Sequence, residues 1–485
     1  MGLNKLAYII IFLFVFISGC AENSATGTRQ LVLLDTQQEE DLGAREHPKV
    51  LKTFGGVYGT NELKEYVNEL GNRLARVSEK PNLKWKFTVL DTPVVNAFAL
   101  PGGYIYVSRG LLALANDEAE LASVIGHEIA HVTARHTAQR HAKETLTQVG
   151  VSLLDLILGQ PIITNVASIG SLGVMAAFSR SEELEADQIG RRYILKAGYD
   201  PLASSNFLFR LDELTKLSSD SNKNLLSYIF DTHPRTEARI NQAKNLNIDN
   251  GKKYLSNRKR YLAAINNITY GESSKNGIVK NNKFMHLHLD IAFTVPSSYV
   301  LENNKSSVVA RKKNKEAVLI FDGMQSEPDL SLLDLIESNI GRSRTQLIEE
   351  LKIFDKPAII VKDKKSALFE DKNYLRSIVL IRWDDFRIWR FNILTHKNSD
   401  KNNYKELMNS VLNFHKLSKE EKIMALPKKI NIHVANRGET LSSLAEMMSL
   451  EKNKIEWLKI INGFSSDIDI NDPIQPGTLI KIIAG

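Results

Sequence analysis

The stretch VIGHEIAHVTARH, from Val124 to His136, places two histidines four residues apart, with a glutamate directly after the first. On an α-helix, positions i and i+4 share a face, so His127 and His131 can both direct an imidazole at one metal ion. Glu128 lies beside that face, where a carboxylate can take a proton from an attacking water. Because the same spacing also occurs on ordinary solvated helices, the stretch alone leaves a zinc site and a polar helix face both open.

The sequence around this stretch predicts a helix, because Asp117 and Glu120 form an N-terminal capping signature. A third metal ligand must come from elsewhere. The segment FSRSEELEADQIGRRYILKAGYDP predicts a second capped helix that carries Glu183, Glu185 and Asp187. Two histidines and one glutamate would leave the fourth position of a tetrahedral zinc site open, which is the catalytic arrangement. Asp187 follows Glu183 by four residues, so it is placed to accept a hydrogen bond from a ligand imidazole.

The region from ATGTRQLVLL to THPRTEARI resembles the gluzincin zinc metallopeptidases of the CAAX prenyl protease and HtpX family, including periplasmic lipoprotein members. The resemblance rests on NAFALPGGYIYVSRGLL, HEIAHVTARH and SRSEELEAD, which occur in that order. It implies one Zn²⁺ per chain, Glu183 as the third zinc ligand, Glu128 as the general base and polypeptides as substrates. Glu182 and Glu185 are then expected to be surface carboxylates.

Three further histidines have open roles. His136 and His141 follow His131 by five and ten residues, away from the metal-facing side, and are expected to be solvated or locally hydrogen-bonded. His233 lies in the family-like segment DTHPRTEAR. It is interpreted as an oxyanion donor, as a ligand that displaces water in a resting state, or as an ordinary helix-start histidine before Pro234.

Two segments bear on substrate access. The resemblance places NAFAL at the edge of the cleft, where unpaired backbone groups can bind an extended polypeptide as an added strand. The following Pro101, Gly102 and Gly103 predict a hairpin turn. The apolar segment VGVSLLDLILGQPIITNVASIGSLGVMAAF is interrupted by Asp155 and Pro161, so no transmembrane helix is expected there. It is interpreted either as two core helices or as a mobile lid.

The only cysteine, Cys20, follows the apolar run LAYIIIFLFVFI, which is too short to span a bilayer but suits a signal peptide. Residues Ile17 to Cys20 resemble a bacterial lipobox, which implies a signal peptide at residues 1–19 and a lipid on Cys20. Because Ala21 rather than aspartate follows, the resemblance to lipoproteins points to the outer membrane, facing the periplasm. An uncleaved anchor helix is the alternative. Residues 20–30 are predicted to be a polar tether.

The rest of the chain predicts a multi-domain α+β protein. Residues 31–250 are expected to form a mainly helical, zincin-type metallopeptidase domain, and the polar, lysine-rich residues 251–280 a linker. Residues 281–420 are expected to form a second α+β domain without a catalytic constellation. Its strand-like runs enclose a predicted helix near RTQLIEELK, and NYKELMNSVLNFH predicts a closing helix.

Residues 428–485 resemble a LysM module, because strand, helix, helix and strand patterns follow one another in that order. The resemblance implies peptidoglycan as a ligand, recognised through loops near Gly438–Leu441 and Gly463–Ile468. A degenerate module that makes only protein contacts is the alternative.

The charge pattern gives little support for nucleic-acid binding, because 63 lysines and arginines are interspersed with 56 acidic residues. The sequence therefore predicts a lipid-anchored zinc metalloendopeptidase of the periplasm that cleaves unfolded or misassembled envelope proteins. The alternatives are a hydrolase of peptidoglycan cross-links and a wall-tethered chaperone or scaffold with a closed zinc site.

Overall fold

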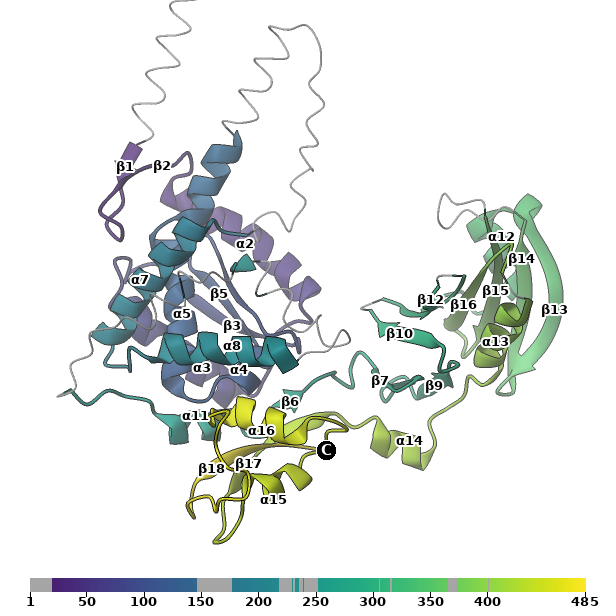
Figure 1. Cartoon of the computed structure of the whole chain (residues 1–485). Helices are drawn as coiled ribbons and strands as arrows, with labels where there is room; N and C mark the ends of the chain where they lie inside the picture. The colour runs from purple at the N-terminus through teal and green to yellow at the C-terminus, as the bar shows by residue number, and fades with distance from the viewer. Residues whose placement is uncertain are drawn as a thin grey trace, which may run out of the picture. The chain divides into compact units, whose positions relative to one another are not determined.

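The computed structural model describes residues 20–145, 177–217, 229, 232–234, 239, 252–304, 306–314, 316–364, 373–399 and 401–485. They form two compact units (Figure 1). The first unit joins the described part of Met1–Gly271 to Lys428–Gly485, and the second is the described part of Glu272–Pro427. The predicted signal peptide and residues 149–176 of the apolar segment lie outside the described residues. None of the described helices is both long and apolar enough to cross a membrane.

The first unit combines helices with a three-stranded sheet of order β3-β5-β4. The strands are β3 (Lys86–Leu90), β4 (Ala97–Leu100) and β5 (Tyr104–Ser108). The helices are α2 (Thr36–Thr53), α3 (Asn61–Arg76), α4 (Arg109–Leu114), α5 (Glu118–Thr133), α7 (Arg180–Lys196), α8 (Ala203–Leu217) and α11 (Arg258–Ile265). The mixed helix-and-sheet, multi-domain architecture agrees with the sequence analysis.

The predicted hairpin after NAFAL is confirmed. β4 pairs antiparallel with β5 from Ala97 to Leu100, and Gly102 and Gly103 adopt φ values of 77° and 89° that suit glycine. Among the described strands, β4 pairs only with β5 and forms an edge of this sheet. An edge strand keeps one row of backbone groups free to pair with another chain.

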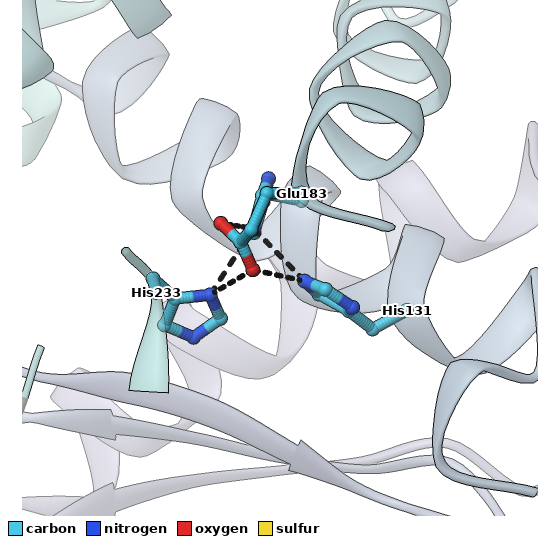
Figure 2. A group of neighbouring side chains, drawn as sticks. His131, Glu183 and His233 are labelled. Carbon is cyan, nitrogen blue, oxygen red and sulfur yellow. Dashed lines mark hydrogen bonds and ion pairs between the residues drawn. The ribbon is translucent and has the colours of Figure 1, made fainter. Parts of the chain in front are cut away.

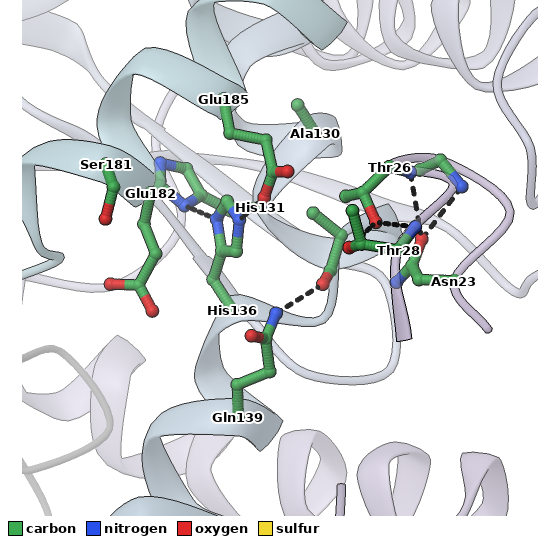
Figure 3. Close-up of polar contacts among 12 residues, drawn as sticks. Asn23, Thr26, Thr28, Ala130, His131, His136, Gln139, Ser181, Glu182 and Glu185 are labelled. Carbon is green, nitrogen blue, oxygen red and sulfur yellow. Dashed lines mark hydrogen bonds and ion pairs between the residues drawn. The ribbon is translucent and has the colours of Figure 1, made fainter. Parts of the chain in front are cut away.

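The predicted polar tether at residues 20–30 is wrong. β1 (Cys20–Glu22) and β2 (Arg29–Leu31) form an antiparallel pair instead. The buried Asn23 organises the turn between them, since its side-chain Oδ1 accepts from the Ala25 and Thr26 amides at 2.8 and 3.4 Å (Figure 3). Its side-chain amide donates to Gln30 Oε1 at 2.9 Å and to the Thr133 carbonyl at 3.0 Å. Because Thr133 is the last residue of α5, this hairpin is tied to the helix that carries HEIAH.

The C-terminal residues have the expected order of strand, helix, helix and strand: β17 (Lys428–Val434), α15 (Leu441–Glu446), α16 (Lys454–Asn462) and β18 (Leu479–Ala484). They do not form a separate body. Their apolar side chains share one continuous core with the peptidase helices. β17 also pairs with β6 (Thr269–Tyr270), so the sheet has the order β18-β17-β6.

The predicted linker at residues 251–280 is wrong up to Gly271, because this part belongs to the first unit. It contains α11, whose Tyr261, Leu262 and Ile265 are completely buried. The Arg258 guanidinium donates to the Asn116 carbonyl at 2.7 Å, just before α5. The high lysine content of residues 251–280 led to the linker prediction, although these three buried positions share one face of a helix.

The second unit is built on a seven-stranded antiparallel sheet of order β10-β11-β12-β16-β15-β14-β13. These strands are β10 (Tyr299–Asn303), β11 (Val308–Lys312), β12 (Ala317–Gln325), β13 (Thr345–Ile353), β14 (Lys356–Asp363), β15 (Tyr374–Arg382) and β16 (Arg387–His396). A smaller sheet contains β7 (Ile278–Lys280), β8 (Lys283–His286) and β9 (Ile291–Thr294). The helices are α12 (Leu332–Ile340), α13 (Lys401–Leu412) and α14 (Lys419–Met424), and a 3₁₀ turn covers Arg342–Arg344.

Helices α12 and α13 cover opposite faces of this sheet. Ile378 and Leu380 of β15 pack with α12, whereas the intervening Val379 and Ile381 pack in the cluster that includes α13. A strand that is buried on both faces needs a continuous apolar run, which explains the run IVLI, Ile378 to Ile381, in β15.

The predicted helix at RTQLIEELK is wrong, because Thr345–Ile353 forms the edge strand β13. This strand pairs with β14 along its length. Phe354 and Asp355 turn the chain with φ values of 49° and 58°, as a two-residue hairpin turn requires. Pairing with β14 thus overrides the helical propensity of the leucines and glutamates. The helix predicted at NYKELMNSVLNFH is confirmed as α13.

Candidate active site

The site forms where α5 and α7 pack closely. Asp117 caps α5 by accepting from the Glu120 amide, and Ser179 and Glu182 form a capping box on α7, as the sequence predicts. Gly190 of α7 faces Gly126 of α5, and a Cβ on Gly190 would lie 2.9 Å from the His127 backbone nitrogen. A larger residue at position 190 would therefore force the two helices apart, and a Cβ on Gly126 would lie a tight 3.2 Å from the Gly190 carbonyl oxygen.

This packing brings three potential metal ligands together. The Nε2 atoms of His127 and His131 are 3.0 Å apart. The Glu183 carboxylate from α7 lies 3.5 Å from His127 Nε2 and 3.4 Å from His131 Nε2. Tetrahedral zinc with bonds of about 2.0–2.1 Å separates its ligand atoms by about 3.3 Å. The donor set and its spacing thus fit a zinc ion.

His233 lies in the same cluster. Its Nδ1 is 2.9 Å from Glu183 Oε1 and 3.4 Å from His127 Nε2, and Figure 2 shows the Glu183 carboxylate between the rings of His131 and His233. One ligand atom from each of His127, His131, Glu183 and His233 lies within 4.8 Å of the others. His233 Nε2 is also 3.4 Å from Glu128 Oε1. The chain therefore brings His233 to the metal-binding group and to the candidate base.

Glu128 faces a cavity beside the ligands. The cavity is lined by residues that include Ala97 of β4, His127, Glu128, His233 and Arg239. Glu128 is buried, and its Oε2 has no hydrogen-bond partner among the residues that the structure describes. Burial raises the pKa of this carboxyl group. A desolvated carboxylate with one free oxygen can accept a proton from a water in the cavity.

Asp187 and Arg239 contact two of the potential ligands, His127 and Glu183. Asp187 Oδ1 lies 2.9 Å from His127 Nδ1. The Arg239 guanidinium donates to both oxygens of Asp187, at 2.6 and 2.9 Å, and its Nη1 lies 2.7 Å from Glu183 Oε2. Burial alone would raise the pKa of Asp187, but hydrogen bonds from His127 and Arg239 lower it to about 2. Arg239 was not predicted as a site residue, although it ends the family-like segment DTHPRTEAR.

His136 is completely buried, so of its two expected states the solvated one is wrong; it is hydrogen-bonded, and its partners belong to the site itself (Figure 3). Its Nδ1 is 2.8 Å from His131 Nδ1, and its Nε2 is 2.9 Å from Glu185 Oε2. Glu185 is thus more than a surface carboxylate. Helical spacing failed here because α5 ends at Thr133 and Arg135 adopts a φ of 60°, which redirects the chain.

The remaining predicted residues lie away from the metal-binding group. Glu182 serves the cap of α7, where its carboxylate accepts from the Ser179 amide at 2.8 Å. His141 is exposed. The exposure of His141 agrees with the sequence analysis, whereas the side chain of Glu182 is only 12% exposed and is not the expected surface carboxylate.

Comparisons with known proteins place this site in a family. Residues 61–247 match the model of peptidase family M48. The chain is 34% identical to the beta-barrel assembly-enhancing protease of Escherichia coli K12 over 193 residues, which is 38% of each chain. It is 35% identical to the mitochondrial metalloendopeptidase OMA1 of Arabidopsis thaliana over 175 residues, covering 36% of this chain and 34% of that one. The chain thus spans well under half of the length of these relatives.

Among solved structures, PsbP of a Synechocystis cyanobacterium aligns with 30% of this chain and 98% of its own, at 13% identity and a TM-score of 0.23. That score is too low to support an argument. The family match, in contrast, covers α5, α7 and His233 together. The chain therefore contains a metallopeptidase domain of family M48 at residues 61–247.

Proposed function

We propose that this protein is a zinc metalloendopeptidase of the bacterial cell envelope that cleaves unfolded or misassembled envelope proteins. The observation that carries the proposal is the convergence of His127, His131 and Glu183 beside the buried Glu128. The name of the Escherichia coli relative, a beta-barrel assembly-enhancing protease, supports envelope proteins as substrates.

The residues of the site have distinct roles in this proposal. His127, His131 and Glu183 would hold the ion, and a bound Zn²⁺ supplies Lewis acidity that activates water and polarises a carbonyl. Glu128 would take the proton of the attacking water and pass it to the leaving amine. Asp187 would fix the orientation of the His127 ring.

The edge strand β4 supports a polypeptide substrate. Ala97 of this strand lines the cavity together with Glu128. An extended peptide that pairs with β4 would run past the base and would be bound through its backbone. Such binding requires an unfolded segment more than a particular side chain, which suits clients that have failed to assemble.

Glu183→Ala tests the ligand set. We expect the variant to lose both zinc and proteolysis of an unfolded protein, because the ion would then keep only His127, His131 and the displaceable His233. Zinc content by atomic absorption and peptide release are the measurements. Glu182→Gln is the matched control, since it retains the cap of α7 and should keep both properties. Full zinc occupancy in Glu183→Ala would assign the third ligand to another residue.

His233→Ala tests a resting state of the site. His233 is proposed as a ligand that displaces water until substrate arrives, because its Nδ1 lies within the ligand group. We expect the variant to keep its zinc and to show higher basal proteolysis. A fall of roughly ten- to a thousandfold would instead assign His233 to the oxyanion. An unchanged rate would leave it as an ordinary helix-start histidine.

The protein is further proposed to be attached to the envelope at two places. A lipid on Cys20, after removal of residues 1–19, would anchor it to the outer membrane facing the periplasm. The C-terminal strand-helix-helix-strand unit is proposed to bind peptidoglycan, as a LysM module would. Two weak attachments on one chain reinforce each other through effective concentration.

Peptidoglycan binding is tested by sedimentation of the non-acylated chain with purified peptidoglycan at low and high salt. The whole chain is needed, because residues 428–485 share their core with the peptidase helices. We expect binding to survive high salt, since hydrogen bonds to sugars resist screening and nonspecific attraction does not. Binding that disappears with salt would leave this unit as a surface for protein contacts.

Two other functions remain as alternatives. The strand-helix-helix-strand unit favours a hydrolase of peptidoglycan cross-links, and His233 in the ligand group favours a chaperone or scaffold with a closed zinc site. Digestion of an unfolded protein beside purified peptidoglycan separates the three. The proposed protease releases peptides from the protein and leaves the wall polymer intact.

A further inference from the structure

The side of His131 that faces away from the metal-binding group carries a second histidine. His131 Nε2 points to His127 and Glu183, at 3.0 and 3.4 Å. Its Nδ1 lies 2.8 Å from the Nδ1 of His136. A neutral imidazole that offers the Nε2 lone pair to a cation carries its proton on Nδ1. His131 must therefore donate this proton to His136, which accepts it on Nδ1.

The hydrogen bond that His136 accepts from His131 determines which ring nitrogen of His136 carries a proton. With its Nδ1 occupied as an acceptor, a neutral His136 carries its own proton on Nε2. This atom lies 2.9 Å from Glu185 Oε2. Glu185 accepts this hydrogen bond, and its carboxylate is the charged end of the hydrogen-bond series His131–His136–Glu185. One arrangement of protons thus satisfies all three side chains, and it directs the lone pair of His131 toward the proposed ion.

The surroundings allow His131 and His136 little freedom to rearrange. Both rings are buried, and Phe178 stacks on His131 with 3.9 Å between ring centroids and 19° between the planes. The backbone of Arg135 is in the left-handed region, and its side chain is held by Glu39 at 3.1 Å. This anchored turn returns His136 to the ligand after α5 has ended.

The two histidine ligands are supported differently. His127 Nδ1 meets a carboxylate directly, because Asp187 lies 2.9 Å away. His131 is linked to a carboxylate, that of Glu185, only through the neutral ring of His136. Removal of His136 would leave the buried Nδ1 of His131 without an acceptor among the described residues, and the ring could then exchange protons or rotate away from the ion.

We propose that His136, held by Glu185, is a positioning residue that fixes the proton and ring orientation of His131 for zinc binding. The inference rests on the proposed zinc function. Hydrogen-bond partners behind metal ligands typically contribute ten- to a hundredfold in metal affinity. His136 does not touch substrate, so its effect on catalysis would arise through His131.

The test measures zinc affinity by competition with a chromogenic chelator, independently of proteolysis. We expect His136→Leu to weaken binding about ten- to a hundredfold. His136→Asn should recover part of this loss, because its Oδ1 can replace the accepting Nδ1. Glu185→Leu should weaken binding less than His136→Leu, and Glu185→Gln should stay near wild type, since it keeps an acceptor oxygen. His141→Leu is the control histidine and should have no effect.

The outcomes separate this inference from the proposed function. If wild type binds zinc and His136→Leu binds it equally well, the positioning role is overturned. If Asn and Leu at this position are equally weak, packing and not the hydrogen bond is responsible, which also overturns it. The variants Glu185→Leu and Glu185→Gln apply the same test at a side chain that is 35% exposed, where a substitution is not expected to cause misfolding. A wild-type chain that binds no zinc would overturn the zinc function itself.

Discussion

Glu128→Gln is expected to keep its zinc and to lose proteolysis by about a hundred- to ten-thousandfold, the range that a general base contributes. The substitution removes the proton acceptor and none of the three proposed ligands. Glutamine has nearly the same volume, so the buried position beside His233 should stay packed. The loss should appear in kcat, because the base acts in the reaction and contributes little to binding an extended peptide.

Zinc stoichiometry and initial rates on an unfolded protein, measured on the same preparation, check this expectation. Glu120 is an unsuitable control because it forms an ion pair with Arg210 at the start of α5. Glu65→Gln on the exposed side of α3 is suitable, and it should leave rate and zinc unchanged. Normal turnover by Glu128→Gln would remove this carboxylate from the mechanism, and loss of its zinc would make the rate uninformative.

The parts of the site that the sequence predicted are those governed by helical periodicity. His127 and His131 share a face of α5, and Glu183 and Asp187 share a face of α7, so spacing placed each pair on one face. The choice of Glu183 as the third ligand came from the family resemblance. The meeting of the two helices depends on Gly126 and Gly190, but glycines in a helix have several explanations and are not predictive by themselves.

The parts that could not be predicted depend on the backbone after a helix ends. Thr133 closes α5, and the left-handed Arg135 then returns His136 to His131. Non-glycine residues rarely adopt this conformation, so local sequence favoured a helix that continues past Thr133 to His136. The structure shows that α5 ends at Thr133 instead. The helix prediction at β13 was wrong for a related reason. The strand is stabilised by hydrogen bonds to β14, and a local sequence pattern does not contain this tertiary pairing.

The C-terminal residues show the same limit at the scale of a domain. Their internal order was predictable because each strand and helix has its own apolar pattern. Their docking was not predictable, because it combines a shared apolar core with a buried lysine in a strand. Lys481 of β18 is completely buried, and its Nζ donates to the carbonyls of Ala113 and Ala115 at 3.0 and 2.6 Å. These carbonyls end α4, directly before the cap of α5.

Lys481→Ala is therefore expected to destabilise the peptidase unit by about 2–5 kcal/mol, because it leaves buried carbonyls without a donor and creates a cavity. Burial, and after it the charges of Arg258 and Arg210, hold the pKa of Lys481 well below its usual range. For a domain of this size the loss corresponds to a fall in Tm of roughly 5–15 °C.

Thermal unfolding combined with hydrogen exchange locates the effect. We expect faster exchange in α4 and at the start of α5, within the peptidase and far from residue 481 in sequence. Lys452→Ala is the control, since Lys452 is an exposed lysine of the same C-terminal unit and should change neither Tm nor exchange. If this unit were an independent module on a flexible connection, Lys481→Ala would alter exchange only within residues 428–485. Zinc content at 25 °C should remain complete in the folded fraction, because Lys481 contacts the cap region and none of the proposed ligands.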